Sequence, residues 1–170
     1  MFFKKKIVKV LAITTILSSM YAGVASADLY SSFNEMANGN LGPTEQALCN
    51  SDSNKCTVAL LAAQDASNNA KNEYPTELHN LRGDALRHAY WQASLTYSTS
   101  ASYAEQWADA HELDHPGPVN ENNMDTYNNS VGRDIASTGS LWNIISRLRS
   151  AIDNGDLLII KNGNVVWSNE

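Results

Sequence analysis

Apolar and small residues in the middle of the chain recur at helical spacing, and prolines or short polar stretches separate the segments that carry them. Pro75 follows the first segment, and Pro116-Gly117-Pro118 stops the third. The pattern predicts helices over residues 57–73, 84–97, 101–114, 121–137 and 140–153. Asp84 stands where a helix N-cap is expected. The last helix has an expected buried stripe of Leu141, Ile144, Ile145, Leu148 and Ile152.

The hydrophobic period changes near the C-terminus. Apolar runs at residues 157–160 and 165–167 flank the sequence Lys161-Asn162-Gly163-Asn164. Asn-Gly between two apolar runs is the strongest short-range signal for a β-hairpin. The sequence therefore predicts an all-α fold, a helical bundle of about five helices with a C-terminal β-hairpin. We expect the four tryptophans in its core: Trp91, Trp107, Trp142 and Trp167.

The first 27 residues have the three-part pattern of a secretory signal peptide. Lys4, Lys5 and Lys6 precede a mostly apolar stretch over residues 7–24, and the small residues Ala25 and Ala27 end it. A membrane anchor would need about 20 strongly apolar residues, whereas hydroxyl residues interrupt this stretch. We therefore expect a secreted protein that is cleaved after Ala27, with no transmembrane segment after cleavage.

Cleavage would make the chain strongly acidic. The full sequence has 12 lysines and arginines against 18 aspartates and glutamates, a net charge of −6. The signal peptide holds four of the lysines and no acidic residue, so 8 basic and 18 acidic residues remain and the net charge becomes −10. Such a surface repels phosphate backbones at long range. The balance argues against a nucleic-acid binding module, but it leaves room for an enzyme with a local pocket.

Cys49 and Cys56 are the only cysteines, and six polar or small residues separate them. In an oxidising compartment this spacing predicts a disulfide that closes a short loop. Nothing near them in the sequence would lower a thiol pKa, so a structural role is favoured over a redox role. The expected organisation is a signal peptide over 1–27, an N-terminal segment with the disulfide loop over 28–56, and the helical domain with its hairpin over 57–170.

Three segments place polar side chains on helix faces that should be buried. Asp84 and His88 lie one turn apart on the same face of one predicted helix. Asp125, Asn129 and Arg133 are spaced at i, i+4 and i+8 on another. Gly132 within that second helix costs about 1 kcal/mol relative to alanine, which suggests a close backbone or ligand approach.

The run His111-Glu112-Leu113-Asp114-His115 fits the HExxH pattern of zinc peptidases. That chemistry needs both histidines on one uninterrupted helix face, the glutamate beside the metal-bound water, and a third ligand from elsewhere. Here Pro116 and Gly117 follow immediately, so His115 is expected at a fraying helix end. We therefore keep a zinc peptidase only as a minor alternative.

The three polar segments also resemble an uncharacterised bacterial domain family that occurs in exported proteins and at the C-terminus of large toxin-like secreted proteins. The matching runs are Asp84-Ala85-x-Arg87-His88-Ala89-x-Trp91, Ala108-Asp109-Ala110-His111-Glu112 and Met124-Asp125-x-x-Asn128-Asn129-x-x-Gly132-Arg133. Gln92 departs from the asparagine expected after the tryptophan, and His115 is outside the pattern. The resemblance implies a shared polar cluster of His88, His111, Glu112, Asp125, Asn129 and Arg133.

This cluster admits two chemical interpretations and one structural one. It could hold a divalent metal such as zinc through His88, His111 and a carboxylate, either Asp125 or Glu112. It could act as a metal-free hydrolase site, with a histidine as general base and Arg133 stabilising negative charge. It could also be a buried network that only ties helices together. We favour a secreted hydrolase, with a non-catalytic exported binding module as the alternative; the sequence identifies no substrate or protein partner.

Overall fold

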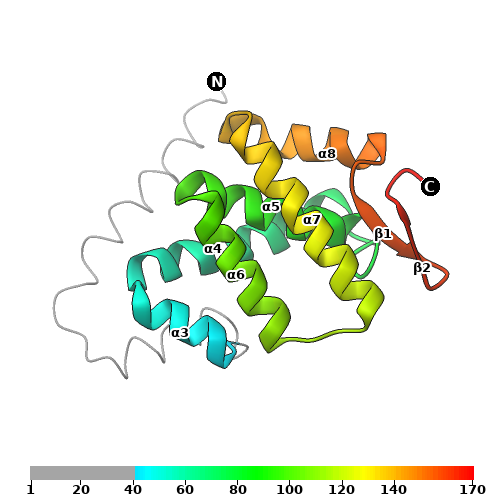
Figure 1. Cartoon of the computed structure of the whole chain (residues 1–170). Helices are drawn as coiled ribbons and strands as arrows, with labels where there is room; N and C mark the ends of the chain where they lie inside the picture. Colours follow the sequence, from blue (N-terminus) through cyan, green and yellow to red (C-terminus); the bar gives the residue numbers. More distant parts are fainter. Residues whose placement is uncertain (1–40) are drawn as a thin grey trace. The chain divides into compact units, whose positions relative to one another are not determined.

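The computed structural model describes residues 41–170, so the predicted signal peptide lies outside the described part of the chain. The described residues form six α-helices, a short 3₁₀ helix and one antiparallel hairpin, in agreement with the predicted all-α fold class (Figure 1). The elements are α3 (Pro43–Ser51), α4 (Ser53–Glu73), α5 (Arg82–Ser98), α6 (Ala101–Asp114), α7 (Val119–Ser137), η1 (Leu141–Asn143), α8 (Ile144–Asn154), β1 (Leu158–Lys161) and β2 (Asn164–Trp167). Within the described residues, no helix is long and apolar enough to cross a membrane.

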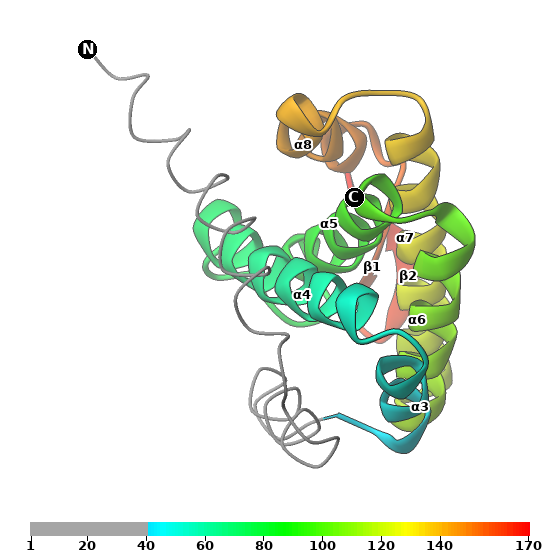
Figure 2. The ribbon, with the colours of Figure 1, turned by 90° about the vertical axis from the view of Figure 1, so that its left-hand side faces the viewer.

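Helix α5 is the centre of the fold. It packs against α4, α6, α7 and α8, and Figure 2 shows it between α4 and α7. Its buried positions include Ala85, Ala89 and Ala93, whose small side chains let the neighbouring helices approach closely. Leu148 and Ile152 of α8 complete this core with no exposed surface, as the predicted stripe requires.

The hairpin is held to the helices by an asparagine of α7. Asn162 and Gly163 form its turn with φ values of 54° and 79°, and the strands pair from Leu158 opposite Trp167 to Lys161 opposite Asn164. The buried Asn128 side chain donates to the Leu158 carbonyl at 2.9 Å and accepts from its N–H at 2.8 Å. The amide thus continues the strand's hydrogen bonding, which fixes the hairpin against α7.

The N-terminal part of the domain differs from the prediction. Cys49 and Cys56 form the predicted disulfide, with Cα atoms 4.7 Å apart, but they lie in α3 and α4 rather than in a loop. The prediction missed α3, which starts at Pro43 and has Glu45 accepting from the Gly42 N–H. Asp52 then breaks the helix and caps α4 by accepting from the Lys55 N–H. The polar spacer is therefore a tight helix–helix junction.

Two further expectations are wrong. Asp84 is not an N-cap, because α5 begins two residues earlier, at Arg82, and Asp84 lies within its first turn. Trp91 and Trp107 are buried, but Trp142 is 88% exposed and Trp167 is 47% exposed. Trp142 lies in the short 3₁₀ helix η1 before α8, and none of the residues of η1 is buried.

Gly132 lies where α7 crosses α5. A Cβ atom added there would collide with the backbone carbonyl of Ala89. Gly132→Ala is therefore expected to lower the free energy of unfolding by about 2 kcal/mol, although alanine favours a helix intrinsically. Urea unfolding would measure this, with Asp134→Ala on the exposed side of α7 as a control that stays within about 0.5 kcal/mol. If Gly132→Ala were as stable as the wild type, the backbones of α5 and α7 could not lie as close together as described.

Candidate functional site

A cavity of about 180 Å³ lies between α5, α6 and α7, and mostly polar side chains line it. Four carboxylate side chains contribute to its wall: Asp84, Glu112, Glu121 and Asp125. Its rim includes His79, whose side chain is 79% exposed, so this cavity, called here the polar cleft, is open to solvent.

His88 projects from α5 and is the most buried histidine at the polar cleft, with a side chain only 1% exposed. The Arg87 guanidinium, which can only donate, lies 2.6 Å from His88 Nε2. His88 Nδ1 must therefore carry the proton, which it donates to Asn129 Oδ1 at 3.3 Å. Burial, followed by the positive charge of Arg87, holds the pKa of His88 well below its usual value. His88 is a neutral imidazole of fixed tautomer.

Asp125 of α7 approaches this imidazole from the other side. Its Oδ1 atom lies 3.2 Å from His88 Nε2, is buried, and has no hydrogen-bond partner. Burial raises the pKa of Asp125 to about 7, with further contributions from the negative charges of Asp84 and Glu112. His88 Nε2 already accepts from Arg87, so a proton on Asp125 would share that lone pair with the guanidinium. Asp125 and His88 thus form a dyad that can hold one exchangeable proton near neutral pH.

Asp84 and Arg87 complete the group around the dyad. Arg87 donates from Nε and Nη2 to Asp84 Oδ1 at 2.9 and 2.5 Å, and the Asn80 N–H donates to the other carboxylate oxygen at 2.8 Å. Ligand atoms of Asp84, His88 and Asp125 lie within 4.8 Å of one another, as a metal site would require. The guanidinium of Arg87 already places a positive charge against two of these three residues.

A second group of titratable side chains joins α3 to the end of α6. Glu45 accepts from His111 Nδ1 at 2.8 Å and from His115 Nε2 at 3.1 Å. Burial alone would raise the pKa of Glu45, but the hydrogen bonds from His111 and Gly42 outweigh burial and lower it. The three side chains also place ligand atoms within 4.8 Å of one another.

The structure divides the predicted site residues. His88, Asp125 and Asn129 meet directly, and Glu112 lines the same polar cleft with a pKa raised by burial. Arg133 instead donates to Gln92 at 3.0 Å and lies 3.6 Å from Glu105, away from the cleft lining. Arg87 takes the position beside the dyad that the sequence interpretation gave to Arg133.

The predicted metal ligands His88, His111 and Asp125 fall into two separate groups. His88 and Asp125 belong with Asp84, whereas His111 belongs with Glu45 and His115. Sequence reasoning did not identify Glu45. The run Gly42-Pro43-Thr44-Glu45, with proline at the first helical position and glutamate two residues later, is the signal that could have identified this helix start.

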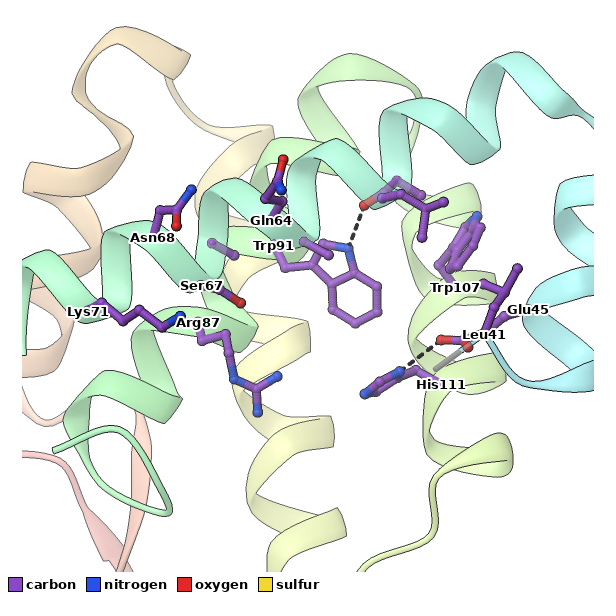
Figure 3. Close-up of a pocket in the computed structure, with 14 residues that line it drawn as sticks. Leu41, Glu45, Gln64, Ser67, Asn68, Lys71, Arg87, Trp91, Trp107 and His111 are labelled. Carbon is purple, nitrogen blue, oxygen red and sulfur yellow. Dashed lines mark hydrogen bonds and ion pairs between the residues drawn. The ribbon is translucent and has the colours of Figure 1, made fainter. Parts of the chain in front are cut away.

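A larger cavity of about 360 Å³ adjoins these groups along α4. Trp91 lies in its wall and donates to the Ala59 carbonyl at 3.2 Å, with Arg87 and His111 on either side of the indole (Figure 3). Gln64, Ser67, Asn68 and Lys71 of α4 add polar groups to the same wall. Arg87 and His111 line this cavity and the polar cleft, so the two spaces share a boundary.

Comparison with protein families gives one match. A family model described as a domain of unknown function (DUF6973) matches residues 46–156, well over half of the 170-residue chain. The three motif segments recognised in the sequence all lie inside this range, whereas Glu45 lies just before it. No curated protein and no solved structure matches the chain.

Proposed function

The chain belongs to the DUF6973 family, whose function is unknown, and from the geometry of the polar cleft we propose that it is a hydrolase that uses Asp125 and His88 as its acid–base dyad. The observation that carries this proposal is the contact of Asp125 Oδ1 with His88 Nε2. A buried carboxyl oxygen without a hydrogen-bond donor lies 3.2 Å from a buried imidazole nitrogen that already accepts from Arg87. A purely structural network would be expected to supply a hydrogen-bond donor to that carboxyl oxygen.

The surrounding residues support this role by orienting the dyad. Asn129 fixes the His88 tautomer, and Asp84 holds the guanidinium of Arg87 against the ring. A group whose pKa lies near the working pH can both take and return a proton efficiently. Glu112 supplies a second carboxyl group on the same cleft wall, where burial favours its protonated form.

The proposed reaction is attack of water on an acyl or phosphoryl centre. The ionised dyad removes a proton from the water molecule as its oxygen bonds to that centre. Arg87, which lines both cavities, stabilises the negative charge that develops. The bond to the leaving group then breaks, and the dyad returns the proton to the leaving group. The larger cavity has the size of a small-molecule site and would hold the rest of the substrate.

A panel of chromogenic substrates tests the proposal: p-nitrophenyl carboxylic esters, phosphate monoesters and diesters, and peptide anilides. We expect turnover of at least one class, with a pH–rate profile that inflects near pH 7. Asp125→Asn keeps the shape of the side chain but removes the base, so the rate should fall by about 100-fold or more. Asp134→Asn, on the exposed side of the same helix, is the matched control and should keep the wild-type rate.

Two results would contradict the proposal. One is that the wild-type protein hydrolyses none of these classes. The other is a wild-type rate in Asp125→Asn, which would show that the turnover belongs to another site.

A further inference from the structure

The junction of α3 and α6 brings together a carboxylate and two imidazoles. Glu45 Oε1 lies 2.8 Å from His111 Nδ1, and Glu45 Oε2 lies 3.1 Å from His115 Nε2. The rings of His111 and His115 have centroids 4.7 Å apart, so both face the same carboxylate. This group, called here the α3–α6 triad, shares no residue with the Asp125–His88 dyad, although His111 and His115 also line the polar cleft.

Contacts outside the triad hold Glu45 and His111 in place. The Gly42 N–H donates to Glu45 Oε2 at 2.9 Å, and the N–H groups of Thr44 and Glu45 both donate to Asp114 Oδ2 at 2.8 Å. The Trp91 ring meets His111 edge-on, with centroids 5.4 Å apart. Ligands that are fixed before binding lose less conformational freedom when an ion arrives.

The triad lacks a permanent positive charge. The Glu45 side chain is only 6% exposed, and among residues 41–170 its ion-pair partners are the two histidines, which are charged only when protonated. The dyad differs in this respect, because the Arg87 guanidinium already lies against Asp84 and His88. A divalent cation would compensate the negative charge of the Glu45 carboxylate, which neutral imidazoles cannot do.

The donor set and spacing suit a zinc-like ion. Zinc bound to imidazole and carboxylate at about 2.0–2.1 Å in a tetrahedron needs ligand atoms about 3.3 Å apart. One ligand atom from each of the three side chains lies within 4.8 Å of the other two, and each imidazole is already within 3.1 Å of one oxygen of Glu45. The side chains of His111 and His115 are 31% and 32% exposed, so an ion can reach them from solvent.

We propose that Glu45, His111 and His115 bind a zinc-class divalent cation that fastens the start of α3 to the end of α6. The ion replaces the two hydrogen bonds on Glu45 with metal–ligand bonds from both histidines and the carboxylate. His115 is the C-cap of α6 and lies outside the helix. The proposed ion would therefore link α3 to the end of α6, and it would not form the helix-borne zinc site of a peptidase. The triad shares no ligand with the dyad, so zinc binding and hydrolysis can be measured separately.

Zinc titration by calorimetry of the purified protein tests the site, with cobalt as a spectroscopic substitute. We expect one zinc ion per chain, a raised melting temperature, and visible cobalt absorption typical of tetrahedral coordination. Glu45→Gln and His115→Ala should each weaken zinc binding by more than 10-fold and remove the cobalt bands. His79→Ala, which removes an exposed imidazole outside the triad, should change neither. Circular dichroism of the metal-free variants confirms that each is folded.

Two outcomes would overturn the proposal. Zinc binding that survives Glu45→Gln and His115→Ala but is lost in Asp125→Asn would assign the ion to the other group. Absence of zinc binding and of cobalt bands at millimolar metal would mean that the triad is only a hydrogen-bonded contact.

Discussion

Asp125→Asn is expected to make the protein more stable at pH 8 and to leave its stability nearly unchanged at pH 4. The pKa of Asp125 is raised from 3.8 to about 7 in the folded protein, mainly by burial. Below pH 4 the carboxyl group is protonated in both the folded and the unfolded chain, so it contributes nothing. As the pH rises from 4 to 7, only the unfolded chain readily loses the proton, and the ionised form then costs stability in the fold.

The substitution removes that cost because the asparagine amide is neutral at every pH. At about 1.4 kcal/mol per pH unit, the difference between 3.8 and about 7 sets an upper limit of roughly 4–5 kcal/mol on the gain at pH 8. Urea unfolding at pH 4, 6 and 8 measures it. Asp134→Asn is the control and should show no comparable change with pH. Loss of stability at pH 8 in Asp125→Asn would instead identify Asp125 as a structural ion-pair partner and favour the non-catalytic binding module.

The helical part of the fold could be predicted because its signals are local. Prolines and polar breaks delimit α4 to α7, and the apolar stripe of α8 with Leu148 and Ile152 is buried as its spacing requires. Helix α3 was missed because its nine residues carry almost no apolar stripe. It is stabilised by contacts from distant sequence, above all Asp114, which caps its first N–H groups.

The candidate site was only partly predictable for the same reason. Helical spacing places Asp84 with His88 and Asp125 with Asn129. Asp84, His88 and Asp125 do line the polar cleft, and Asn129 bonds to His88. Spacing within a helix does not say which faces of different helices oppose each other. Arg133 shares a face with Asp125 in the sequence, but one turn beyond Asn129 that face meets Gln92 rather than the dyad. Arg87 precedes His88 on α5, and its guanidinium lies 2.6 Å from the His88 imidazole.

Arg87→Met is expected to lower the free energy of unfolding at pH 7 by roughly 3 kcal/mol. Methionine keeps the length of the aliphatic stem but leaves the buried Asp84, whose side chain is 4% exposed, without its guanidinium partner. An unpaired buried carboxylate is far more costly than a broken surface ion pair. Arg149→Met is the matched control: its partner is Glu73 at 3.2 Å, the arginine side chain is 54% exposed, and the loss should stay below about 1 kcal/mol.

A double-mutant cycle separates the charge effect from lost packing. Asp84→Asn removes the carboxylate that Arg87 compensates, so Arg87→Met should cost much less in that background than in the wild type. We expect a coupling energy of about 1–3 kcal/mol between the two positions from urea unfolding of the four proteins. Additive effects would mean that Arg87 stabilises the fold only through the packing of its aliphatic stem. That result would contradict the proposal that Asp84 keeps the positive charge of Arg87 beside the dyad. Strong coupling would show that Asp84 sets the position of that charge, because the carboxylate is what keeps the guanidinium within reach of His88.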